Sequence, residues 1–346
     1  MNGTSRSISR NIAVLGAGSW GTALAVHFAD AGGHRVKLWA RDADLARRMA
    51  VERANPDYLP GVELPPRLEP ISDLEALCGC ELYLLVVPSH GFRDVLRRFL
   101  RVHPKDRPVP VISGTKGIET ETLARMSQVA FEEGMAADCE VRFAVLSGPT
   151  FAAELAGSMP SAAVIAADDA RFATEIRECF ATRWLRLYSS SDVVGVELGG
   201  AVKNVIAVAA GTLNGLGFGH NTLAALITRG LHEITRLGIA YGGQPRTFAG
   251  LAGLGDLVLT CTGGLSRNRQ TGIELATGKT LEQITSGTHL VAEGIRNSLA
   301  VSRLAAARGV EMPITQAMAA VMYAGKNPRK AVEELMTREL KSEAEL

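Results

Sequence analysis

A short apolar run near the start of the chain ends in a glycine-rich turn. Residues 12–15, Ile-Ala-Val-Leu, lead directly into Gly16-Ala17-Gly18-Ser19-Trp20-Gly21, and an apolar stretch follows from about residue 20 to 31. The run is typical of a buried parallel strand, and the longer stretch is typical of a helix. The sequence therefore predicts a strand, a tight turn and a helix in immediate succession, which opens a layered α/β fold.

The three glycines of this turn have the GxGxxG spacing of a dinucleotide-binding loop. In such a loop the first glycine, here Gly16, makes the tight turn. The second, Gly18, lets a pyrophosphate approach the backbone, and the third, Gly21, lets the helix pack closely on the strand. The N-terminus of the helix then faces the phosphates with its partial positive charge. A plain tight turn is the alternative, and the flanking strand and helix favour the dinucleotide.

The pattern of the chain changes near residue 190. Before it, apolar runs of strand length alternate with amphipathic stretches, among them residues 91–102 and 120–133. The expected strands are residues 12–15, 35–40, 82–87, 108–113, 142–146, 161–166 and 184–188. This alternation predicts a parallel sheet with helices on both faces. After it, helical stretches such as 221–237, 294–308 and 314–323 are joined by glycines. We expect an α/β domain with a doubly wound, Rossmann-type sheet over residues 1–190, and an all-helical C-terminal domain over 191–346.

A lysine interrupts the most apolar segment of the helical half. Lys203 lies in residues 197–210, where the only other polar side chains are Glu197 and Asn204. Such a run predicts a buried helix, and a buried ammonium group is costly unless it is paired or catalytic. A carbonyl-reducing dehydrogenase needs a proton donor of this kind. The alternative is a lysine whose flexible stem carries its charge to the surface.

The second expected strand ends at the position that selects between nicotinamide cofactors. Arg41 and Asp42 follow it, about 20 residues after the glycine loop. An acid there suits the ribose hydroxyls of NADH, whereas an arginine suits the 2′-phosphate of NADPH. Because Arg41 comes first, we expect NADPH to be used and NADH also to be accepted. The alternative is that Arg41 is a solvated surface charge.

Three further clusters combine glycine with polar side chains. Residues 113–117 and 146–152 each follow an expected strand, at the sheet edge where ligands bind, and contain Lys116 and Thr150. Residues 253–257 carry Asp256 and are followed by Ser266-Arg267-Asn268-Arg269. A hydroxyl, a guanidinium and an amide ahead of a helix form a good anion site. As alternatives, Asp256 or Ser266 could be only a helix N-cap, and Lys116 only a turn lysine.

Together these motifs resemble one enzyme family. They are GxGSWGTA at 16–23, GTKG at 114–117, SGPTFAAE at 147–154, ELGGAVKN at 197–204, GLGDLVLTCT at 253–262, SRN at 266–268 and VAEG at 291–294. In this order, over about residues 11–330, they resemble the bacterial, soluble, NAD(P)-dependent glycerol-3-phosphate dehydrogenases of biosynthesis. The resemblance implies reversible reduction of dihydroxyacetone phosphate to sn-glycerol 3-phosphate by NADPH or NADH, which supplies glycerophospholipid synthesis.

The resemblance also implies a role for each matching position. Lys203 would be the catalytic acid/base, Lys116 would contact substrate and cofactor and help to polarise the carbonyl, and Asp256 would bind substrate and help to hold Lys203. The remaining substrate-binding residues would be Gly148, Thr150, Ser266, Arg267 and Asn268. The cofactor-binding residues would be Gly16, Gly18, Ser19, Trp20, Gly21, Arg41, Lys116, Ala152, Arg267, Val291 and Glu293.

Composition limits the other partners. The net charge of +1 indicates no nucleic acid or other polyanion. The odd number of scattered cysteines is typical of reduced thiols, and neither a metal site nor a signal peptide is expected. No uninterrupted apolar stretch reaches membrane-spanning length. The resemblance implies a cytoplasmic enzyme, and the apolar helical domain predicts a homodimer.

Two other functions fit parts of the sequence. A β-hydroxyacid or 6-phosphogluconate-type dehydrogenase would share the two domains and a helical lysine, but the Ser-Arg-Asn cluster and the GTKG loop favour a short phosphorylated substrate. A non-catalytic sensor of NAD(P) would need no buried lysine beside an anion site. A panel of ketone and hydroxyacid substrates distinguishes the first alternative from a glycerol-3-phosphate dehydrogenase. A Lys203→Ala variant that keeps full biological activity would support the second alternative.

Overall fold

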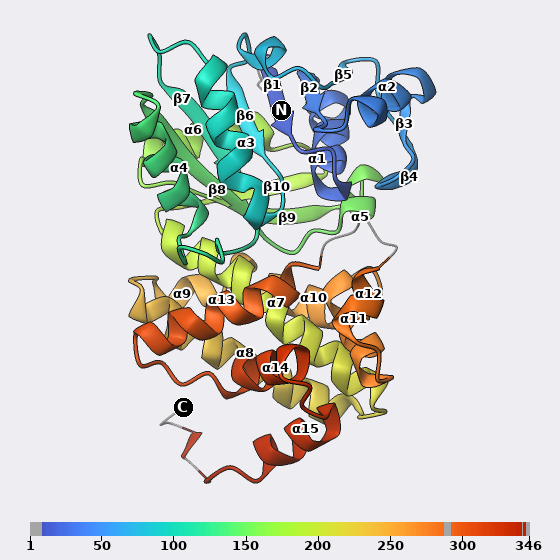
Figure 1. Ribbon diagram of the computed structural model, residues 1–346. Helices are drawn as coiled ribbons and strands as arrows, with labels where there is room; N and C mark the ends of the chain where they lie inside the picture. The colour runs from blue at the N-terminus through green and yellow to red at the C-terminus, as the bar shows by residue number, and fades with distance from the viewer. Residues whose placement is uncertain (1–8, 287–291, 341, 344–346) are drawn as a thin grey trace, which may run out of the picture. The chain divides into compact units, whose positions relative to one another are not determined.

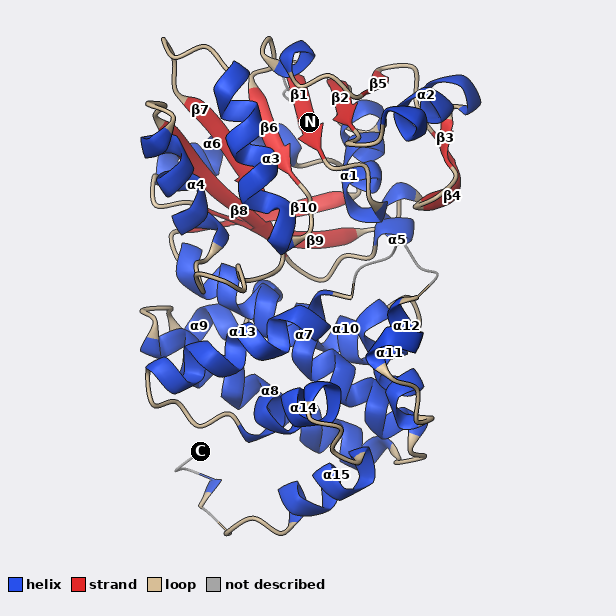
Figure 2. Cartoon of the chain, in the orientation of Figure 1, coloured by secondary structure: helices blue, strands red, loops and turns tan. Residues whose placement is uncertain are grey.

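The chain forms two compact units. The computed structural model describes residues 9–286, 292–340 and 342–343. The first unit comprises residues 1–115 and 126–193, and the second comprises 116–125 and 194–346 (Figure 1). Figure 2 shows the strands gathered in the first unit and helices throughout the second. The prediction of a Rossmann-type α/β domain followed by a helical domain is confirmed.

The first unit is built on an eight-stranded sheet with the order β10-β9-β8-β7-β6-β1-β2-β5. Its strands are β1 (Asn11–Leu15), β2 (Arg35–Trp39), β5 (Leu68–Ile71), β6 (Leu82–Leu85), β7 (Val109–Ser113), β8 (Val141–Ser147), β9 (Ser161–Ala166) and β10 (Leu185–Ser190). The chain builds outward from β1 through β2 to β5, then crosses to β6 on the other side of β1. The glycine loop follows β1 at this reversal of strand order, the place where open α/β sheets bind ligands.

All seven expected strands are present, and the structure corrects the prediction in two respects. Strand β5 and a small hairpin of β3 (Ala54–Asn55) and β4 (Leu59–Glu63) were not expected. The sheet is also not wholly parallel, because β9 runs antiparallel to β8. The segment between them holds only the five-residue helix α5 (Ala152–Ala156), whereas a parallel neighbour requires a crossover that is usually a longer helix.

Alternate residues of the strands face two different helical layers. Ile12 and Val14 of β1 belong to one cluster with residues of α1, α2, α5 and α6. On the other face, the ring of Tyr83 of β6 contacts that of Phe99 of α3, and Phe143 of β8 contacts Phe131 of α4. The helices are α1 (Ser19–Asp30), α2 (Ala43–Glu52), α3 (Ser89–Val102), α4 (Met126–Ala136) and α6 (Ala170–Phe180). Cover on both faces explains why the central strands β1 and β6 are almost continuously apolar.

Helix α4 begins later than its sequence pattern indicated. The expected stretch started at residue 120, but residues 118–125 form a turn closed by a bridge between Ile118 and Arg125. Leu123 lies in this turn with a φ of 61°, a left-handed conformation that ends any helix. Residues 116–125, which contain this turn, belong to the second unit.

The second unit is helical around one long central helix. Its elements are α7 (Val193–Gly215), α8 (His220–Ala240), α9 (Pro245–Phe248), the π-helical turn η2 (Leu251–Gly255), α10 (Asp256–Thr262), α11 (Arg267–Ala276), α12 (Leu281–Thr285), α13 (Glu293–Ala307), α14 (Pro313–Tyr323) and α15 (Pro328–Met336). By length and composition α7 could cross a bilayer, but 94% of its most apolar window is buried inside the protein. It is the central element of this unit's core, which it forms with α8, α10, α13 and α14.

Candidate active site

The glycine loop of the first unit has the geometry that its sequence predicts. Gly16 has a φ of +122°, and a Cβ there would lie 2.4 Å from the carbonyl oxygen of Val86. A Cβ at Gly21 would lie 1.9 Å from the carbonyl oxygen of Gly16. At Gly18, by contrast, no described residue other than its two chain neighbours has an atom within 4 Å of the position that a Cβ would take. Gly16 and Gly21 are therefore required by packing, and Gly18 leaves open space beside the backbone.

The helix that follows the loop presents its N-terminus to that space. Gly18 is the N-cap of α1, no side chain caps the helix, and its first turn holds no acidic residue. Uncapped N–H groups at a helix start favour an anion. The indole Nε1 of Trp20 is also buried without a hydrogen-bond partner among the described residues. These features fit the phosphates of a dinucleotide.

A buried asparagine that sequence analysis missed fixes the loop. Asn55 is fully buried, and its Nδ2 donates to the carbonyl oxygen of Ala17 and to Oγ1 of Thr22, both at 2.8 Å. Nearby, Oγ of Ser19 donates to the carbonyl oxygen of Tyr58 at 2.6 Å. Residues 55 and 58 lie in a polar stretch without a motif, so only the folded structure shows that they support the loop.

The two charged residues after β2 have different surroundings. Asp42 is the N-cap of α2, where one carboxylate oxygen accepts from the backbone N of Asp44 at 2.8 Å and of Leu45 at 3.3 Å. Arg41 is exposed and has no hydrogen bond or ion pair among the residues that the structure describes. The carboxylate is therefore already engaged by its own helix, while the guanidinium extends into solvent.

The segment after β8 makes a tight turn at the carboxyl end of the strand, where Ser147 and Gly148 are buried. Gly148 has a φ of +154°, and a Cβ there would lie 2.8 Å from Cα of Ala163. Oγ1 of Thr150 donates to the carbonyl oxygen of Gly148 at 3.3 Å, and Ala152 begins helix α5. The hydroxyl of Ser147, which sequence analysis did not single out, is buried without a partner within the described part of the chain.

In the second unit, one carboxylate lies between two lysine ammonium groups. Lys203 of α7 is buried, and its Nζ lies 2.5 Å from Oδ1 of Asp256. Nζ of Lys116 lies 2.7 Å from the other oxygen, Oδ2. Asp256 is only 1% exposed, so water contributes little to screening these charges. The cluster carries one excess positive charge in a largely dry site.

This environment shifts the acidity of the buried lysine. Burial lowers the pKa of Lys203 to about 8, the Asp256 carboxylate opposes that shift, and the nearby charge of Lys116 adds to it. A lysine normally has a pKa of about 10.4 and is almost fully protonated near neutrality. With the lowered pKa, Lys203 can both donate and accept a proton close to physiological pH.

Local backbone geometry places the carboxylate. The π-helical turn η2 leads directly into Asp256 at the start of α10, and π-turns are frequent at functional sites. Gly253 is necessary in that turn because a Cβ there would lie 2.1 Å from the carbonyl oxygen of Phe248. The GLGD motif therefore positions Asp256 at the head of a helix, where its side chain reaches the lysine instead of capping its own backbone.

A threonine that sequence analysis missed completes the lysine's surroundings. Nζ of Lys203 donates to Oγ1 of Thr260 at 2.6 Å, and this hydroxyl donates to the carbonyl oxygen of Asp256 at 2.6 Å. Thr260 lies one helical turn after Asp256, so both side chains lie on one face of α10. That spacing within the GLGDLVLTCT motif is the signal that could have identified it.

Asparagine side chains connect this cluster to the Ser-Arg-Asn segment. Nδ2 of Asn204 donates to the carbonyl oxygen of Lys116 at 3.2 Å, and its Oδ1 accepts from Nδ2 of Asn268 at 2.9 Å. Oδ1 of Asn268 in turn accepts from the backbone N of Gly294 at 2.9 Å. The amides thereby bring the first turn of α11 close to the lysines.

Close packing of two helices makes this approach possible. A Cβ at Gly272 of α11 would lie 1.9 Å from the carbonyl oxygen of Val208 on α7, and a Cβ at Gly211 of α7 would lie 1.8 Å from that of Arg269. Helices α7 and α11 therefore touch backbone to backbone. Ser266 is the N-cap of α11, with its Oγ accepting from the backbone N of Arg269, and Arg267 is partly buried in the first turn.

The remaining predicted residues are placed only in part. Glu293 is the first residue of α13, directly before the Gly294 that contacts Asn268. Val291 lies outside the described residues. Within the described part of the chain, no three His, Cys, Asp or Glu side chains are grouped so that they could hold a metal ion.

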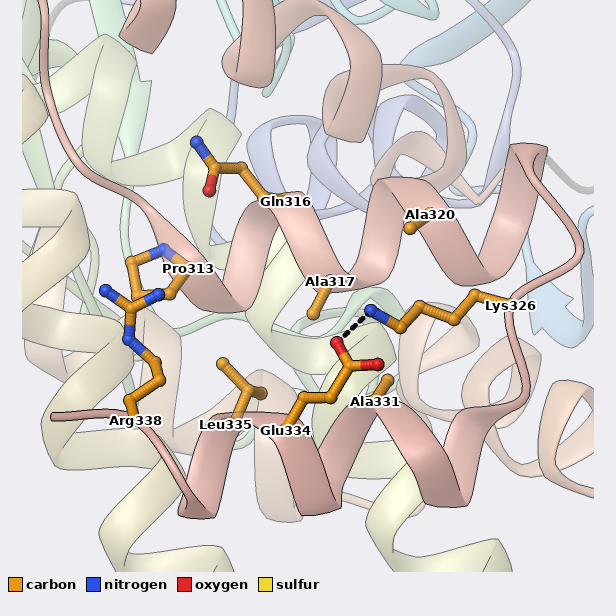
Figure 3. A pocket seen from close by; sticks show the side chains of 9 residues that line it. All are labelled: Pro313, Gln316, Ala317, Ala320, Lys326, Ala331, Glu334, Leu335 and Arg338. Carbon is orange, nitrogen blue, oxygen red and sulfur yellow. Dashed lines mark hydrogen bonds and ion pairs between the residues drawn. The ribbon is translucent and has the colours of Figure 1, made fainter.

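A separate hollow of about 230 Å³ lies between α14 and α15. It is lined by Pro313, Gln316, Ala317, Ala320, Lys326, Ala331, Glu334, Leu335 and Arg338, and an ion pair of Lys326 with Glu334 crosses it (Figure 3). The lining contains none of the predicted site residues. The hollow is therefore separate from the lysine cluster.

Comparison with known proteins identifies a family for both halves of the chain. Residues 11–173 match the family described as NAD-dependent glycerol-3-phosphate dehydrogenase N-terminus, and residues 192–333 match its C-terminus. A protein of Citrifermentans bemidjiense is 51% identical over 337 residues, which cover 97% of this chain and 99% of the relative. One of Oleidesulfovibrio alaskensis is 53% identical over 333 residues, which cover 96% and 99%. Both bear the name glycerol-3-phosphate dehydrogenase (NAD(P)+).

A solved structure agrees with these relatives. The crystal structure of glycerol-3-phosphate dehydrogenase from Coxiella burnetii is 38% identical and superposes with a TM-score of 0.90, covering 95% of this chain and 99% of that one. The similarity extends over both units of the fold.

Proposed function

This chain belongs to the NAD-dependent glycerol-3-phosphate dehydrogenase family, and we propose that Lys203 transfers the proton in the reaction of that family. The protein is an oxidoreductase that uses NADH or NADPH to reduce dihydroxyacetone phosphate, reversibly, to sn-glycerol 3-phosphate. The observation that carries the proposal is the ion pair of the buried Lys203 with Asp256, whose carboxylate also pairs with Lys116.

Lys203 has the properties that a proton donor to the ketone requires. A bound nicotinamide cofactor supplies the hydride that reduces the C2 carbon of the substrate. The ammonium group of Lys203 then protonates the C2 oxygen, and in the reverse direction its neutral amine removes the proton from the C2 hydroxyl. Its lowered pKa keeps both forms accessible near neutrality. General acid–base catalysis of this kind typically contributes about 10²–10⁴-fold to the rate.

The neighbours of Lys203 stabilise the charge that develops. Negative charge accumulates on the C2 oxygen during reduction, and positive groups fixed in a dry site lower the barrier to it. We assign Lys116 to this task, together with contacts to substrate and cofactor. Asp256 holds both ammonium groups on one carboxylate and binds the substrate. Two lysines on one carboxylate leave the site net positive, as an oxyanion requires.

The phosphate end of the substrate is assigned to the start of α11. Ser266, Arg267 and Asn268 combine a helix N-terminus, a guanidinium group and an amide, which suit a phosphate. Asn268 is linked through Asn204 to the main chain of Lys116, so hydrogen bonds connect the proposed phosphate site to the catalytic cluster. From the first unit, Gly148 and Thr150 are proposed to bind the substrate as well.

The cofactor is assigned chiefly to the glycine loop. The open space at Gly18 and the uncapped start of α1 support this assignment. The proposed cofactor-binding residues are Gly16, Gly18, Ser19, Trp20, Gly21, Arg41, Lys116, Ala152, Arg267, Val291 and Glu293. With the carboxylate of Asp42 engaged in capping α2, we propose that Arg41 gives a preference for NADPH. In domain terms, residues 1–190 are proposed as the main cofactor-binding domain, and residues 191–346 carry the acid/base and contribute Arg267, Val291 and Glu293 to the cofactor.

The cellular setting follows from the family reaction. We propose that the protein is a cytoplasmic homodimer whose product is the backbone precursor of glycerophospholipids. The five free cysteines, four of them buried, are consistent with a reducing compartment.

A spectrophotometric assay tests the proposal. Purified protein is mixed with dihydroxyacetone phosphate and NADPH or NADH, and the loss of cofactor absorbance is followed for wild type, Lys203→Met and the exposed control Lys279→Met. Methionine should keep the packing of α7. The melting temperature of each variant checks that the fold is intact. We expect rapid oxidation by wild type and the control, and a loss of about 10²–10⁴-fold in Lys203→Met. A folded Lys203→Met protein with full activity would remove the lysine from its central role. Activity of the wild type with hydroxyacids alone would favour the related dehydrogenases.

A further inference from the structure

Lys116 reaches the catalytic cluster from a short loop that belongs to the helical unit. Residues 116–125 lie in that unit, although the chain on either side belongs to the sheet unit. The bridge between Ile118 and Arg125 closes the loop, and Arg125 pairs with the buried Glu197 of α7 at 2.6 Å. The ion pair of Arg125 with Glu197 therefore holds the C-terminal end of the loop against α7.

At its near end the loop is held by two carboxamides, that of Asn204 of α7, which donates to the carbonyl oxygen of Lys116 at 3.2 Å, and that of Asn297. Asn297 of α13 is fully buried, and its Nδ2 donates to the carbonyl oxygen of Lys116 at 3.3 Å and to that of Ala201 on α7 at 3.1 Å. Its Oδ1 accepts from the backbone N of Ile118 at 3.3 Å. The side chain thus contacts the main chain on both sides of Gly117 and ties it to the helix that carries Lys203.

This pattern requires an asparagine specifically. The site asks for two donors and one acceptor on a short planar group, which a carboxamide supplies. A carboxylate of the same shape has no hydrogens to donate and would face two carbonyl oxygens. An apolar side chain would leave the fully buried N–H of Ile118 without a partner. The arrangement is therefore more selective than simple filling of the core.

We infer that Asn297 is a positioning residue for Lys116: its carboxamide fixes the main chain around Gly117 and thereby sets the Lys116 ammonium on Asp256 Oδ2. The inference rests on the proposed catalytic role of Lys116. Asn297 acts through the lysine and has no role in proton transfer itself. Small displacements of catalytic groups cost rate steeply, so loosening this main chain reduces activity even when the fold persists.

A double-mutant cycle tests the inference. The values of kcat/KM for dihydroxyacetone phosphate are measured for wild type, Asn297→Ala, Lys116→Ala and the double variant. We expect Asn297→Ala to lower kcat/KM about tenfold in the wild-type background, and less than twofold once Lys116 is absent, because coupled residues are not additive. Arg303→Ala is the matched control. Arg303 also lies on α13 and donates to the same loop, but at the carbonyl oxygen of Thr120, and we expect it to leave kcat/KM unchanged.

The outcomes separate this inference from the function on which it rests. An equal loss in both backgrounds would mean that Asn297 acts by another route and would overturn the inference. Full activity of Lys116→Ala would instead overturn the proposed role of the lysine. If Asn297→Ala does not fold, Asn297→Thr is used instead, because threonine keeps one donor and one acceptor. It should lower kcat/KM by a smaller factor, and this decrease must also disappear in the Lys116→Ala background. Unchanged kcat/KM in every Asn297 variant that folds would likewise overturn the inference.

Discussion

The ammonium group of Lys203 donates to the hydroxyl of Thr260 at 2.6 Å, and that hydroxyl has its own proton engaged elsewhere. Thr260 donates to the carbonyl oxygen of Asp256, also at 2.6 Å. Because its hydrogen is committed to the helix backbone, the hydroxyl must present a lone pair to the lysine. Thr260 therefore fixes the direction of the Nζ group, while Asp256 supplies the opposing charge.

Replacing Thr260 with valine should reduce catalysis without unfolding the protein. The side chains have nearly the same shape, so the main loss is the acceptor for Lys203. A hydrogen bond to a charged group is worth about 1.5–3 kcal/mol, which predicts a fall in kcat of roughly 10- to 100-fold. Thr262→Val is the matched control, since Thr262 makes the same bond to its own helix at an exposed position. Equal kcat values for the two variants would contradict this role.

The pKa of Lys203 predicts opposite pH profiles for the two directions. Reduction needs the ammonium form, so its kcat/KM, which reports the free enzyme, should fall as pH rises through about 8. Oxidation of glycerol 3-phosphate needs the neutral amine, so its kcat/KM should rise over the same range. Initial rates in both directions between pH 6 and 10 measure this. Two profiles with the same slope would show that another group controls the titration.

Removing the partner carboxylate should shift these profiles in a defined direction. The charge of Asp256 raises the pKa of Lys203, whereas burial and Lys116 lower it. In Asp256→Asn burial and Lys116 still lower the pKa and are opposed only by the smaller effect of Cys261, so both profiles should move to lower pH as kcat/KM falls. Asp44→Asn at an exposed site is the control. A shift to higher pH would contradict the charge balance described here.

Two glycines of the cofactor loop should respond differently to alanine. At Gly18 the new methyl group meets no atom within 4 Å among the described residues beyond its two chain neighbours, so we expect a stability loss below about 1 kcal/mol but a cofactor KM raised at least about tenfold, because the methyl occupies the space left for phosphate. At Gly21 the methyl would lie 1.9 Å from the carbonyl oxygen of Gly16, which predicts a loss of about 1–3 kcal/mol. Melting temperature and KM together distinguish the two effects. Similar melting temperatures would contradict the packing argument.

The sequence predicted the sheet well because its strands are buried on both faces. The central runs are almost continuously apolar, as in β1 and β6, and stand out from the surrounding chain. Strand β5 was missed because it lies at the edge and reads Leu-Glu-Pro-Ile, which has few apolar residues. The antiparallel direction of β9 was missed because apolar pattern carries no information about strand direction. That direction depends on how the connection folds.

The same distinction applies to the site. Lys203 stood out because one charge interrupts an apolar helix, a contrast visible in the sequence alone. Asn55 and Asn297 did not, because their importance comes from partners distant in sequence, such as the carbonyl oxygens of Ala17 and Lys116. Thr260 was missed although its spacing from Asp256 places both on one face of α10. A short polar side chain in a helix or loop is common, and only tertiary contacts show which ones are buried and satisfied.

Arg41 provides a test of cofactor choice. The Asp42 carboxylate is engaged at the start of α2, which leaves the exposed guanidinium of Arg41 to meet a 2′-phosphate. We expect Arg41→Ala to raise the KM for NADPH about tenfold, roughly the value of one charge-assisted bond, and to leave the KM for NADH nearly unchanged. Arg47→Ala, on the helix α2 that Arg41 precedes, is the control. An unchanged ratio of the two KM values would assign the preference to another residue.

A buried carboxylate in the helical unit caps a helix to which it does not belong. Glu233 of α8 is 1% exposed, and its two oxygens accept from the backbone N of Ile314 at 2.6 Å and of Thr315 at 3.1 Å, at the start of α14. Burial raises the pKa of Glu233 to about 7, against the lowering effect of these bonds, of the Thr315 hydroxyl and of Arg236. The carboxyl group is therefore protonated more readily in the folded protein than in the unfolded chain.

This difference predicts how stability depends on pH. Between the ordinary pKa of 4.5 and about 7 the folded state binds more protons than the unfolded state, so the contribution of Glu233 is full at low pH and is lost as pH rises to 7. Glu233→Gln cannot titrate. The free energy of unfolding of wild type relative to this variant should therefore fall between pH 5 and 8, by up to about 3 kcal/mol. Denaturant titrations of both proteins at several pH values measure this difference. As a control, the free energy of unfolding of wild type relative to Glu282→Gln, a substitution at an exposed position, should show no such trend. Parallel stability curves for wild type and Glu233→Gln would mean that the carboxyl group keeps its ordinary acidity in the fold.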